Sequence, residues 1–252
     1  MKKSFLNHEK SLLTVMLQCE TPETVIYRVR NSMPMGADAY GLQVESLKPE
    51  YHNKETYRRI FDEMKDKPCY VTNYRLAHNT GQTDEELGEG LIQLASCGAT
   101  LCDVIGDMFS KHPEQITDDP KAIDKQMKLI DRLHNQGAEV LISSHLYKFA
   151  PAERVLEIAY EQKRRGADVI KIVTGADNME QQLENLKISA MLQKEFDAPF
   201  LFLSVGESSI HRRLGMRLGC SLALCVYEHD LLSTPQQPLL STMKKIRDEI
   251  DF

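Results

Sequence analysis

The sequence lacks an excess of basic residues. Its 31 lysines and arginines are outnumbered by 37 aspartates and glutamates, and the formal net charge is −6 at pH 7. Nucleic acids and anionic membrane surfaces are bound by basic faces, so we expect neither as a partner. The sequence has no apolar run near the roughly 18–20 residues that span a bilayer. Its first residues, MKKSFLNHEKS, lack the apolar stretch of a secretory signal, which predicts a cytoplasmic protein.

Three missing motifs narrow the choice of fold and chemistry. The six cysteines form no C-x-x-C pair, so we expect free, buried thiols in place of a disulfide framework. No G-x-G-x-x-G loop follows the first strand-like run, which disfavours an open dinucleotide-binding sheet. A linker or low-complexity segment is also missing, so we predict a single domain over residues 1–252.

What the sequence does contain is a recurring unit of a helical stretch, a glycine and a short apolar run. QGAEVL, RGADVI and LGCSLA are examples. Glycine just past a helix end adopts the left-handed conformation at little cost and turns the chain into the next strand. Eight such strands alternating with helices predict a parallel sheet covered by helices. At this length a closed (β/α)8 barrel is the first choice, and a doubly wound open sheet the second.

The predicted elements follow from these apolar runs and from helical spacing between them. The strands are predicted at 12–17, 39–44, 69–73, 100–105, 139–143, 168–173, 200–204 and 221–226. The helices are predicted at 21–33, 54–64, 84–96, 121–136, 151–165, 179–195, 208–218 and after Pro238.

A lysine, Lys171, interrupts the apolar run of the sixth strand, GADVIKIVTG. Most strand lysines extend their amine to solvent. Here valines and isoleucines flank the lysine on both sides, so both faces of the strand look buried. Burial disfavours the charged form of an amine, and a neutral amine attacks carbonyls to form a Schiff base. The residues alone leave an extended lysine and a Schiff-base lysine equally open.

Other polar residues follow the strands at the end where a barrel carries its function. His145 ends the fifth strand, and it is suited either to a structural hydrogen bond or to moving protons for imine chemistry. Arg213 follows the seventh strand and either binds an anion or forms a solvated pair with Arg212. Ser233 and Gln237, in STPQQP, are hydrogen-bonding candidates in what is otherwise a polar loop.

Aspartates follow the fourth strand, and an arginine follows the third. Asp103, Asp107 and His145 are metal-ligand types, but they lack a dedicated metal-binding spacing, so we predict no metal. Arg75 ends the third strand in TNYR.

The order of these residues resembles that of the type I 3-dehydroquinate dehydratases, the Schiff-base dehydratases of the shikimate pathway. Order and spacing agree over four loops and nearly the whole chain. The matching segments are Ser143–His145, Gly166–Ile172, Ser204–Leu214 and Ser233–Gln237. The resemblance implies a lyase that converts 3-dehydroquinate to 3-dehydroshikimate in aromatic amino acid biosynthesis. It also implies that the reaction uses no cofactor.

The resemblance implies a role for each matching residue. Lys171 would form an imine with the substrate ketone, and His145 would move the protons. Arg213 would hold the substrate carboxylate, with Ser233 and Gln237 on its hydroxyl or carboxylate side. The substrate class is then a carboxylated cyclic β-hydroxy ketone.

Three features depart from the family pattern. Gly41 and Gln43 stand where the family has a glutamate and an arginine, and Gln43 joins Arg75 as a substrate-binding candidate. The glutamate that orients the histidine on the family's fourth strand is missing here, and Asp107 or Asp103 is the candidate to orient His145 instead. Only about eleven residues precede the first strand, so the N-terminal hairpin of many members is expected to be short or absent.

Two other functions stay open from the residues. One is an imine-forming lyase, dehydratase or aldolase that acts on a different β-hydroxy ketone. The other is a barrel that binds a small molecule without catalysis. A homodimer is compatible with the sequence, which leaves the oligomeric state open.

Overall fold

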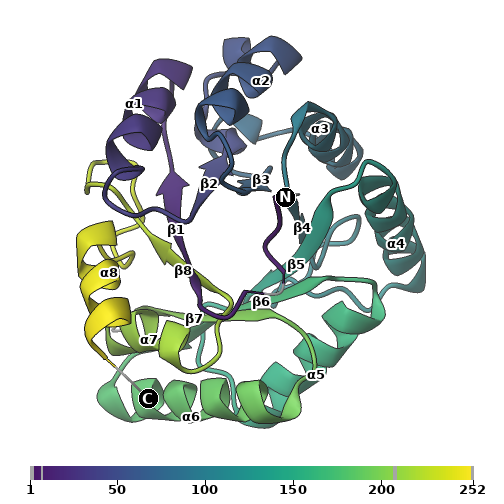
Figure 1. Ribbon diagram of the computed structural model, residues 1–252. Coiled ribbons are helices and arrows are strands. Elements are labelled where there is room, and N and C mark those ends of the chain that lie inside the picture. Colours follow the sequence, from purple (N-terminus) through teal and green to yellow (C-terminus); the bar gives the residue numbers. More distant parts are fainter. Residues whose placement is uncertain (1–2, 7, 207–208, 251–252) are drawn as a thin grey trace.

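The computed structural model describes residues 3–6, 8–206 and 209–250, in which eight parallel strands form a nearly closed barrel (Figure 1). Neighbouring strands follow the order β7-β6-β5-β4-β3-β2-β1-β8, and a parallel bridge between Phe200 and Cys220 brings the two ends of the sheet together. The strands are β1 (Leu12–Leu17), β2 (Ala39–Gln43), β3 (Cys69–Thr72), β4 (Leu101–Ile105), β5 (Glu139–His145), β6 (Val169–Ala176), β7 (Phe200–Gly206) and β8 (Leu222–Cys225).

Helices form the outer ring around these strands (Figure 1). They are α1 (Pro22–Ser32), α2 (Lys54–Glu63), α3 (Asp84–Cys97), α4 (Pro120–Asn135), α5 (Ala152–Arg164), α6 (Met179–Glu195), α7 (Ser209–Leu214) and α8 (Leu240–Glu249). This alternation confirms the predicted (β/α)8 barrel.

Local sequence signals set the ends of several helices. Thr83 caps α3 with its side chain, and Glu86 completes a capping box, which satisfies two backbone donors that the first turn leaves free. Gly98 follows α3 with φ 115°, a left-handed conformation that favours glycine. Gly166 has φ 100° after α5 and turns the chain into the strand that carries Lys171.

Side chains alternate between two apolar layers along each strand. One set, which includes Ile170 and Ile172, packs under the helices in the larger core. The other set, which includes Val169 and Val173, fills the barrel interior. Lys171 lies between Val169 and Val173 in the sequence, so the same alternation turns it into the barrel, where it is 5 % exposed.

Several predicted boundaries differ from the structure. Strands β5 to β7 extend two or three residues further, because β6 and β7 stay paired as far as Ala176 and Gly206. The helix predicted over 208–218 is shorter, since α7 ends at Leu214 and a 3-10 turn follows over Gly215–Arg217. Residue 208 lies outside the described residues.

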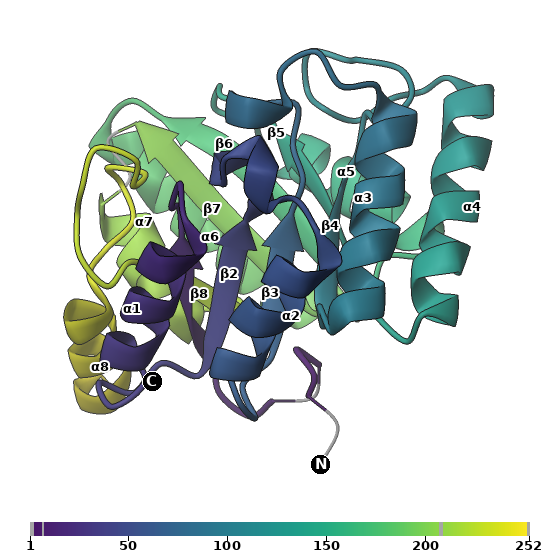
Figure 2. The ribbon, with the colours of Figure 1, turned by 90° about the horizontal axis from the view of Figure 1, so that it is seen from above.

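The amino end of the barrel is closed by the N-terminal segment, which lies at the opposite end from the strand arrowheads (Figure 2). Phe5 is 1 % exposed and packs with the interior set of side chains. Its backbone N–H donates to the Glu139 carboxylate at 2.7 Å. The described residues before β1 form no strand, so a covering hairpin is absent from them. The Phe5 side chain therefore covers this end of the barrel interior.

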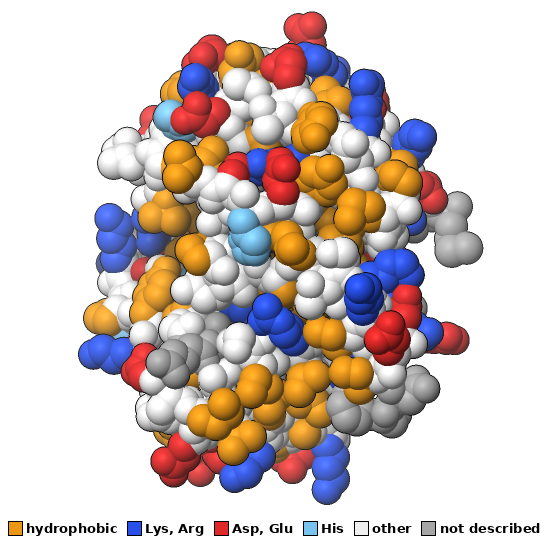
Figure 3. Space-filling view, turned by 90° about the vertical axis from the view of Figure 1, so that its left-hand side faces the viewer, with side chains coloured by type: hydrophobic (Ala, Val, Ile, Leu, Met, Phe, Trp, Pro, Cys, Tyr) orange, Lys and Arg blue, Asp and Glu red, His pale blue; other side chains and the backbone are white. Residues whose placement is uncertain are grey.

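The outer surface mixes side chains of all types. On the face shown in Figure 3, basic side chains lie in separate groups among acidic and apolar ones. No helix within the described ranges is long and apolar enough to cross a membrane.

Candidate active site

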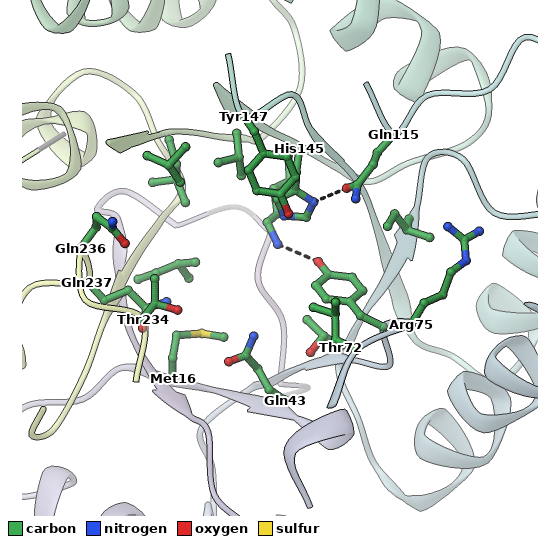
Figure 4. A pocket seen from close by; sticks show the side chains of 18 of the residues that line it. Met16, Gln43, Thr72, Arg75, Gln115, His145, Tyr147, Thr234, Gln236 and Gln237 are labelled. Carbon is green, nitrogen blue, oxygen red and sulfur yellow. Dashed lines mark hydrogen bonds between the residues drawn. The ribbon is translucent and has the colours of Figure 1, made fainter. Parts of the chain in front are cut away.

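A cavity of about 740 Å³ lies at the carboxyl ends of the strands. All eight strands contribute side chains to it, from Met16 on β1 to Leu224 on β8. Figure 4 shows His145, Tyr147 and Gln115 together, with Gln236, Gln237 and Thr234 on a different side of the cavity. This is the end of a (β/α)8 barrel at which active sites lie.

Lys171 lies at the floor of this cavity in a closed group of polar side chains. Its Nζ donates to the Tyr70 hydroxyl at 2.8 Å, the Tyr74 hydroxyl at 2.9 Å and Asp103 Oδ2 at 3.0 Å. Both phenols donate to Asp103 Oδ2, and Ser143 Oγ donates to Asp103 Oδ1 at 2.5 Å. These five residues are the lysine cluster.

The hydrogen bonds of the lysine cluster fix its protons. Each phenol has one proton, which it gives to Asp103, so Lys171 must donate to both phenol oxygens and to the carboxylate. An ammonium has three protons and makes these three bonds. Burial and the Asp103 charge raise the pKa of Tyr70 and Tyr74 well above the ordinary value, which keeps both phenols protonated. The resting site therefore holds an ammonium paired with a carboxylate.

His145 lies one interior position nearer the cavity mouth than Ser143, on β5 next to the strand of Lys171. Its Nδ1 lies 2.6 Å from Gln115 Oε1, and its ring stacks with Tyr147 at 6.0 Å between centroids. Burial, followed by the Lys171 charge, lowers the pKa of His145 to about 3. The ring is thus neutral at physiological pH and is able to accept a proton.

Two of the residues that contact His145 have unusual backbone conformations. Gln115 has φ 50° and Tyr147 has φ 56°, although neither is glycine. Such conformations cost of order 1–3 kcal/mol and concentrate at functional sites. Sequence reasoning missed both residues, because Gln115 lies thirty residues before His145 in an irregular loop.

Arg212, the neighbour of the predicted Arg213, lines the cavity. Arg212 is 7 % exposed, and its Nε donates to the Ser204 carbonyl at 2.6 Å. Among the residues that the structure describes it has no carboxylate partner, and burial lowers its pKa to about 10. Arg213 lies outside the cavity and donates to the Ser209 carbonyl. An anion in the cavity would therefore meet Arg212.

Two glutamine carbonyl oxygens at the cavity are buried without a hydrogen-bond partner in the described part of the chain. They are Oε1 of Gln43 and Oε1 of Gln237, which is 5 % exposed as a residue. A buried acceptor without a partner is costly, so a bound ligand with donors gains affinity there. We call Gln43, Gln237 and Arg212 the ligand wall.

The remaining predicted site residues have structural partners. Ser233 Oγ bonds Asp230 within the loop and does not line the cavity, whereas its neighbour Thr234 does. Arg75 lines the cavity, but its guanidinium bonds both Asp84 and Asp107.

Neither aspartate proposed to orient His145 bonds it. Asp107 is held by Arg75 and by the backbone N–H of His112, and Asp103 belongs to the lysine cluster. Gln115 takes the orienting position instead.

Gly41 makes room for neighbouring side chains. A Cβ at this position would lie 2.3 Å from Met16 Sδ and 3.0 Å from the Tyr70 ring. The space that a larger residue would take is thus filled by a thioether and by the ring that contacts Lys171. This region of the cavity is apolar where the family resemblance implied charged side chains.

Metal ligands are not grouped in the described ranges: no three His, Cys, Asp or Glu side chains are placed to hold an ion. All six cysteines are free thiols, and five of them are buried, while Cys97 is half-buried.

Fold and site together define a (β/α)8 barrel with a buried lysine at the floor of its cavity. The profile of the type I 3-dehydroquinase family matches residues 13–251. The chain therefore belongs to this family of lyases, whose members dehydrate 3-dehydroquinate. A comparison with curated protein sequences gives no match.

Solved structures of similar fold include several 3-dehydroquinate dehydratases. The enzyme from Geobacillus kaustophilus HTA426 has TM-score 0.82 and 13 % identity, covering 98 % of this chain and 94 % of that chain. The enzyme from Clostridium difficile, solved with covalently modified comenic acid, has TM-score 0.79 and 16 % identity, with 96 % and 92 % covered. The enzyme from Aquifex aeolicus VF5 has TM-score 0.72 and 20 % identity, with 96 % and 99 % covered. At these identities the likeness supports the shared fold.

Proposed function

We propose that this chain converts 3-dehydroquinate to 3-dehydroshikimate through an imine on Lys171. The observation that carries the proposal is the position of Lys171 Nζ, buried at the floor of the cavity beside a neutral histidine. The family match supports the overall reaction. The contacts of Lys171 and His145 described above support the residue roles that we assign.

The reaction begins when the Lys171 ammonium gives up one proton, so that its nitrogen lone pair attacks the ketone carbon and the second C=O bond pair moves to oxygen. In all, the ammonium loses two protons to the ketone oxygen, which leaves as water, and a protonated imine with one N–H remains. His145 then takes a proton from the carbon next to the imine, and the bond electrons move toward the imine nitrogen. The resulting enamine expels the β-hydroxyl, which leaves as water with the proton from His145. Hydrolysis of the imine releases the product.

Charge balance explains the buried carboxylate. Asp103 is paired with the ammonium before the reaction and with the protonated imine after water is lost. The net charge of the lysine cluster is therefore the same in both states, and no uncompensated charge is buried during imine formation. A fixed carboxylate also needs no reorganisation in the transition state.

The ligand wall complements the other groups of the substrate. Arg212 presents a guanidinium without a carboxylate partner in the described residues, which suits the substrate carboxylate. The free carbonyl oxygens of Gln43 and Gln237 are acceptors that suit substrate hydroxyls. Substrate binding would thus supply the partners that these three side chains lack.

The test is to mix the purified protein with 3-dehydroquinate and follow the ultraviolet absorbance of the conjugated enone. We expect a steady rise with the wild type and none with Lys171→Ala. Lys163→Ala is the matched control, because this lysine is exposed on α5, where its Nζ donates to the Asp197 carbonyl and lies over the Phe196 ring, outside the cavity. Full activity of Lys171→Ala would refute the proposal.

A second candidate is an imine-forming dehydratase for a related keto acid with fewer polar groups. The apolar region made by Gly41, Met16 and Tyr70 favours it. A panel of β-hydroxy ketones, each tested by borohydride reduction and mass measurement, separates the two. Trapping with 3-dehydroquinate at the highest rate supports the first function, and faster trapping with a less hydroxylated ketone supports the second.

Cellular location and assembly belong to the same proposal. A cytoplasmic location fits the six free thiols, since disulfides are rare in that compartment. Cell fractionation tests the location, and sedimentation equilibrium tests the homodimer against the monomer. The absence of a nucleic-acid partner stays a prediction that a gel-shift assay checks.

A further inference from the structure

The two phenols of the lysine cluster are not equivalent. Tyr70 lies within β3 and is 0 % exposed, whereas Tyr74 lies two residues beyond the end of β3 and is 8 % exposed. Tyr74 also makes an edge contact with the His145 ring, at 5.7 Å between centroids. The Tyr74 hydroxyl is therefore the one that a substrate held between Lys171 and His145 would reach.

Imine formation needs a proton path that the amine cannot provide alone. Two protons must move from the lysine nitrogen to the ketone oxygen. After the attack, both of these atoms are bonded to the same carbon. Direct transfer across that carbon would pass through a strained four-membered ring. A hydroxyl that bridges nitrogen and oxygen converts this ring to a six-membered one and acts as a general acid and base.

We propose that Tyr74 is a catalytic residue that carries both protons from Lys171 to the ketone oxygen. This inference rests on the proposed function, because it assigns the first half of that reaction. The Tyr74 oxygen already accepts a hydrogen bond from Nζ at 2.9 Å, which places one end of the bridge.

Each transfer leaves the phenol unchanged. In the first, Tyr74 accepts a proton from the ammonium and gives its own proton to the ketone oxygen, while nitrogen bonds to carbon. In the second, Tyr74 again accepts a proton from nitrogen and gives one to the hydroxyl. The carbon–oxygen bond breaks, its electron pair leaves with water, and the nitrogen lone pair forms the imine. In balance, Lys171 loses two protons, the departing water gains two, and Tyr74 keeps one throughout.

The surroundings of Tyr74 allow this change of hydrogen-bond direction. Its O–H bond turns about the C–O bond from Asp103 toward the substrate. Asp103 keeps three other donors, from Tyr70, Lys171 and Ser143. The Tyr74 backbone N–H donates to the buried Glu45 carboxylate at 3.3 Å, which holds the residue in place.

His145 is less suited to this half of the reaction. Its Nδ1 is bonded to Gln115, and the hydrogen bonds of Nζ go to the two phenols and to Asp103. In this assignment His145 removes the proton from carbon, and Tyr74 transfers the protons from nitrogen to oxygen.

The experiment measures imine formation apart from dehydration. Reversible imine formation exchanges the ketone oxygen with water, so loss of an ¹⁸O label from 3-dehydroquinate reports on it, together with the rate of borohydride trapping. We compare Tyr74→Phe with Tyr70→Phe, which removes the other phenol that bonds Nζ. Tyr40→Phe is the control, because its hydroxyl bonds the Val29 carbonyl under the helices.

We expect Tyr74→Phe to slow label exchange and trapping by about 100-fold, the size of a general acid–base contribution. Tyr70→Phe should slow them by only about threefold, because it loses one hydrogen bond that holds Nζ. With substrate deuterated at the carbon that loses its proton, the isotope effect on turnover should fall toward one for Tyr74→Phe alone. A general loss of structure would lower the rate and leave the isotope effect unchanged.

Each contrary result has a separate meaning. Exchange by Tyr74→Phe at the wild-type rate overturns the role of Tyr74 and leaves the proposed function intact. Equal losses in Tyr74→Phe and Tyr70→Phe also overturn it, because both phenols would then only position the lysine. A wild-type protein that neither exchanges the label nor is trapped contradicts the proposed function and this inference together.

Discussion

The lysine cluster and the ligand wall lie in the same cavity but differ in their hydrogen bonds. In the lysine cluster each donor and acceptor of the reacting groups has a partner at 2.5–3.0 Å or closer. In the ligand wall two carbonyl oxygens have no partner among the described residues, and a guanidinium has no carboxylate. The lysine cluster is thus fully hydrogen-bonded before substrate binds, whereas the ligand wall gains hydrogen-bond partners only when substrate binds.

This difference predicts opposite responses to mutation. Removing one member of a satisfied buried network leaves its partners unpaired, so stability should fall. Removing an unpartnered group should weaken binding with little loss of stability. Functional sites often keep such costly groups because the ligand uses them.

The largest effect is expected for Asp103→Ala, which leaves the Lys171 ammonium buried without its carboxylate. The free energy of unfolding should fall by about 3–5 kcal/mol, as for other broken buried pairs. Urea denaturation at neutral pH measures it. Asp124→Ala is the control, since its pair with Lys128 is exposed and should contribute less than about 0.5 kcal/mol. Equal stabilities of the two variants would show that the lysine cluster does not hold a buried ion pair.

Arg212→Ala should weaken substrate binding, with a loss of stability limited to its hydrogen bond to the Ser204 carbonyl. Loss of a charged hydrogen bond to the carboxylate costs about 1.5–3 kcal/mol, which is roughly a 10- to 150-fold rise in KM. Arg213→Ala should leave KM near the wild-type value, because Arg213 lies outside the cavity. Steady-state kinetics with 3-dehydroquinate compares them, and a rise in KM confined to Arg213→Ala would reverse the assignment.

The third prediction concerns pH and Gln115. Because the pKa of His145 is lowered to about 3, the base form persists well below the ordinary value of 6.5. The acidic limb of kcat/KM should therefore lie well below pH 6.5 in the wild type. Gln115→Glu places a carboxylate at Nδ1, which raises the pKa of His145 and moves that limb toward neutral pH.

The pH–rate profiles of the wild type, Gln115→Glu and Gln115→Ala give the answer. A wild-type limb at 6.5 that the glutamate does not move would contradict the orienting role of Gln115.

The lowered pKa of His145 also makes the free energy of unfolding depend on pH. Between pH 6.5 and about 3 this histidine is protonated in the unfolded chain and neutral in the folded one. His211, buried with its pKa also lowered to about 3, acts in the same direction. The free energy of unfolding should thus fall as the pH decreases through this window.

The smallest effect is expected for Gln43→Leu. Loss of one neutral hydrogen bond to substrate costs about 1 kcal/mol, or roughly a fivefold rise in KM. Stability should stay level or rise, because a buried oxygen without a partner is removed.

Gln162→Leu is the contrasting variant. Its amide bonds Ser144 Oγ and both the N–H and carbonyl of Lys171, so its loss should lower stability by about 1–3 kcal/mol. Thermal unfolding of both variants tests the contrast, and a larger loss in Gln43→Leu would contradict it.

Much of the barrel could be predicted from the sequence because its signals are local. Glycines at positive φ mark helix ends, and apolar runs mark strands buried on both faces. The apolar neighbours of Lys171 indicated a strand buried on both faces, and the structure then shows this lysine in the barrel interior. The ends of β5 to β7 were missed, because pairing between strands carries them into residues that look polar, such as Ser144 and Thr174.

The site residues that sequence reasoning missed depend on long-range contacts. Tyr70 and Tyr74 lie about one hundred residues from Lys171 in the chain, and only closure of the barrel brings them to Nζ. The choice between Arg212 and Arg213 depends on the first turn of a helix of six residues, whose phase the spacing does not fix. Gln115 sits in a loop whose conformation at φ 50° has no sequence signature.

The most direct test of an imine at the floor of this cavity is covalent trapping followed by peptide mapping. The protein is incubated with 3-dehydroquinate and borohydride, digested and examined by mass spectrometry. An added mass equal to the reduced substrate adduct on the peptide that carries Lys171 is the predicted result. Turnover of 3-dehydroquinate without any adduct, or with the adduct on another lysine, would contradict it.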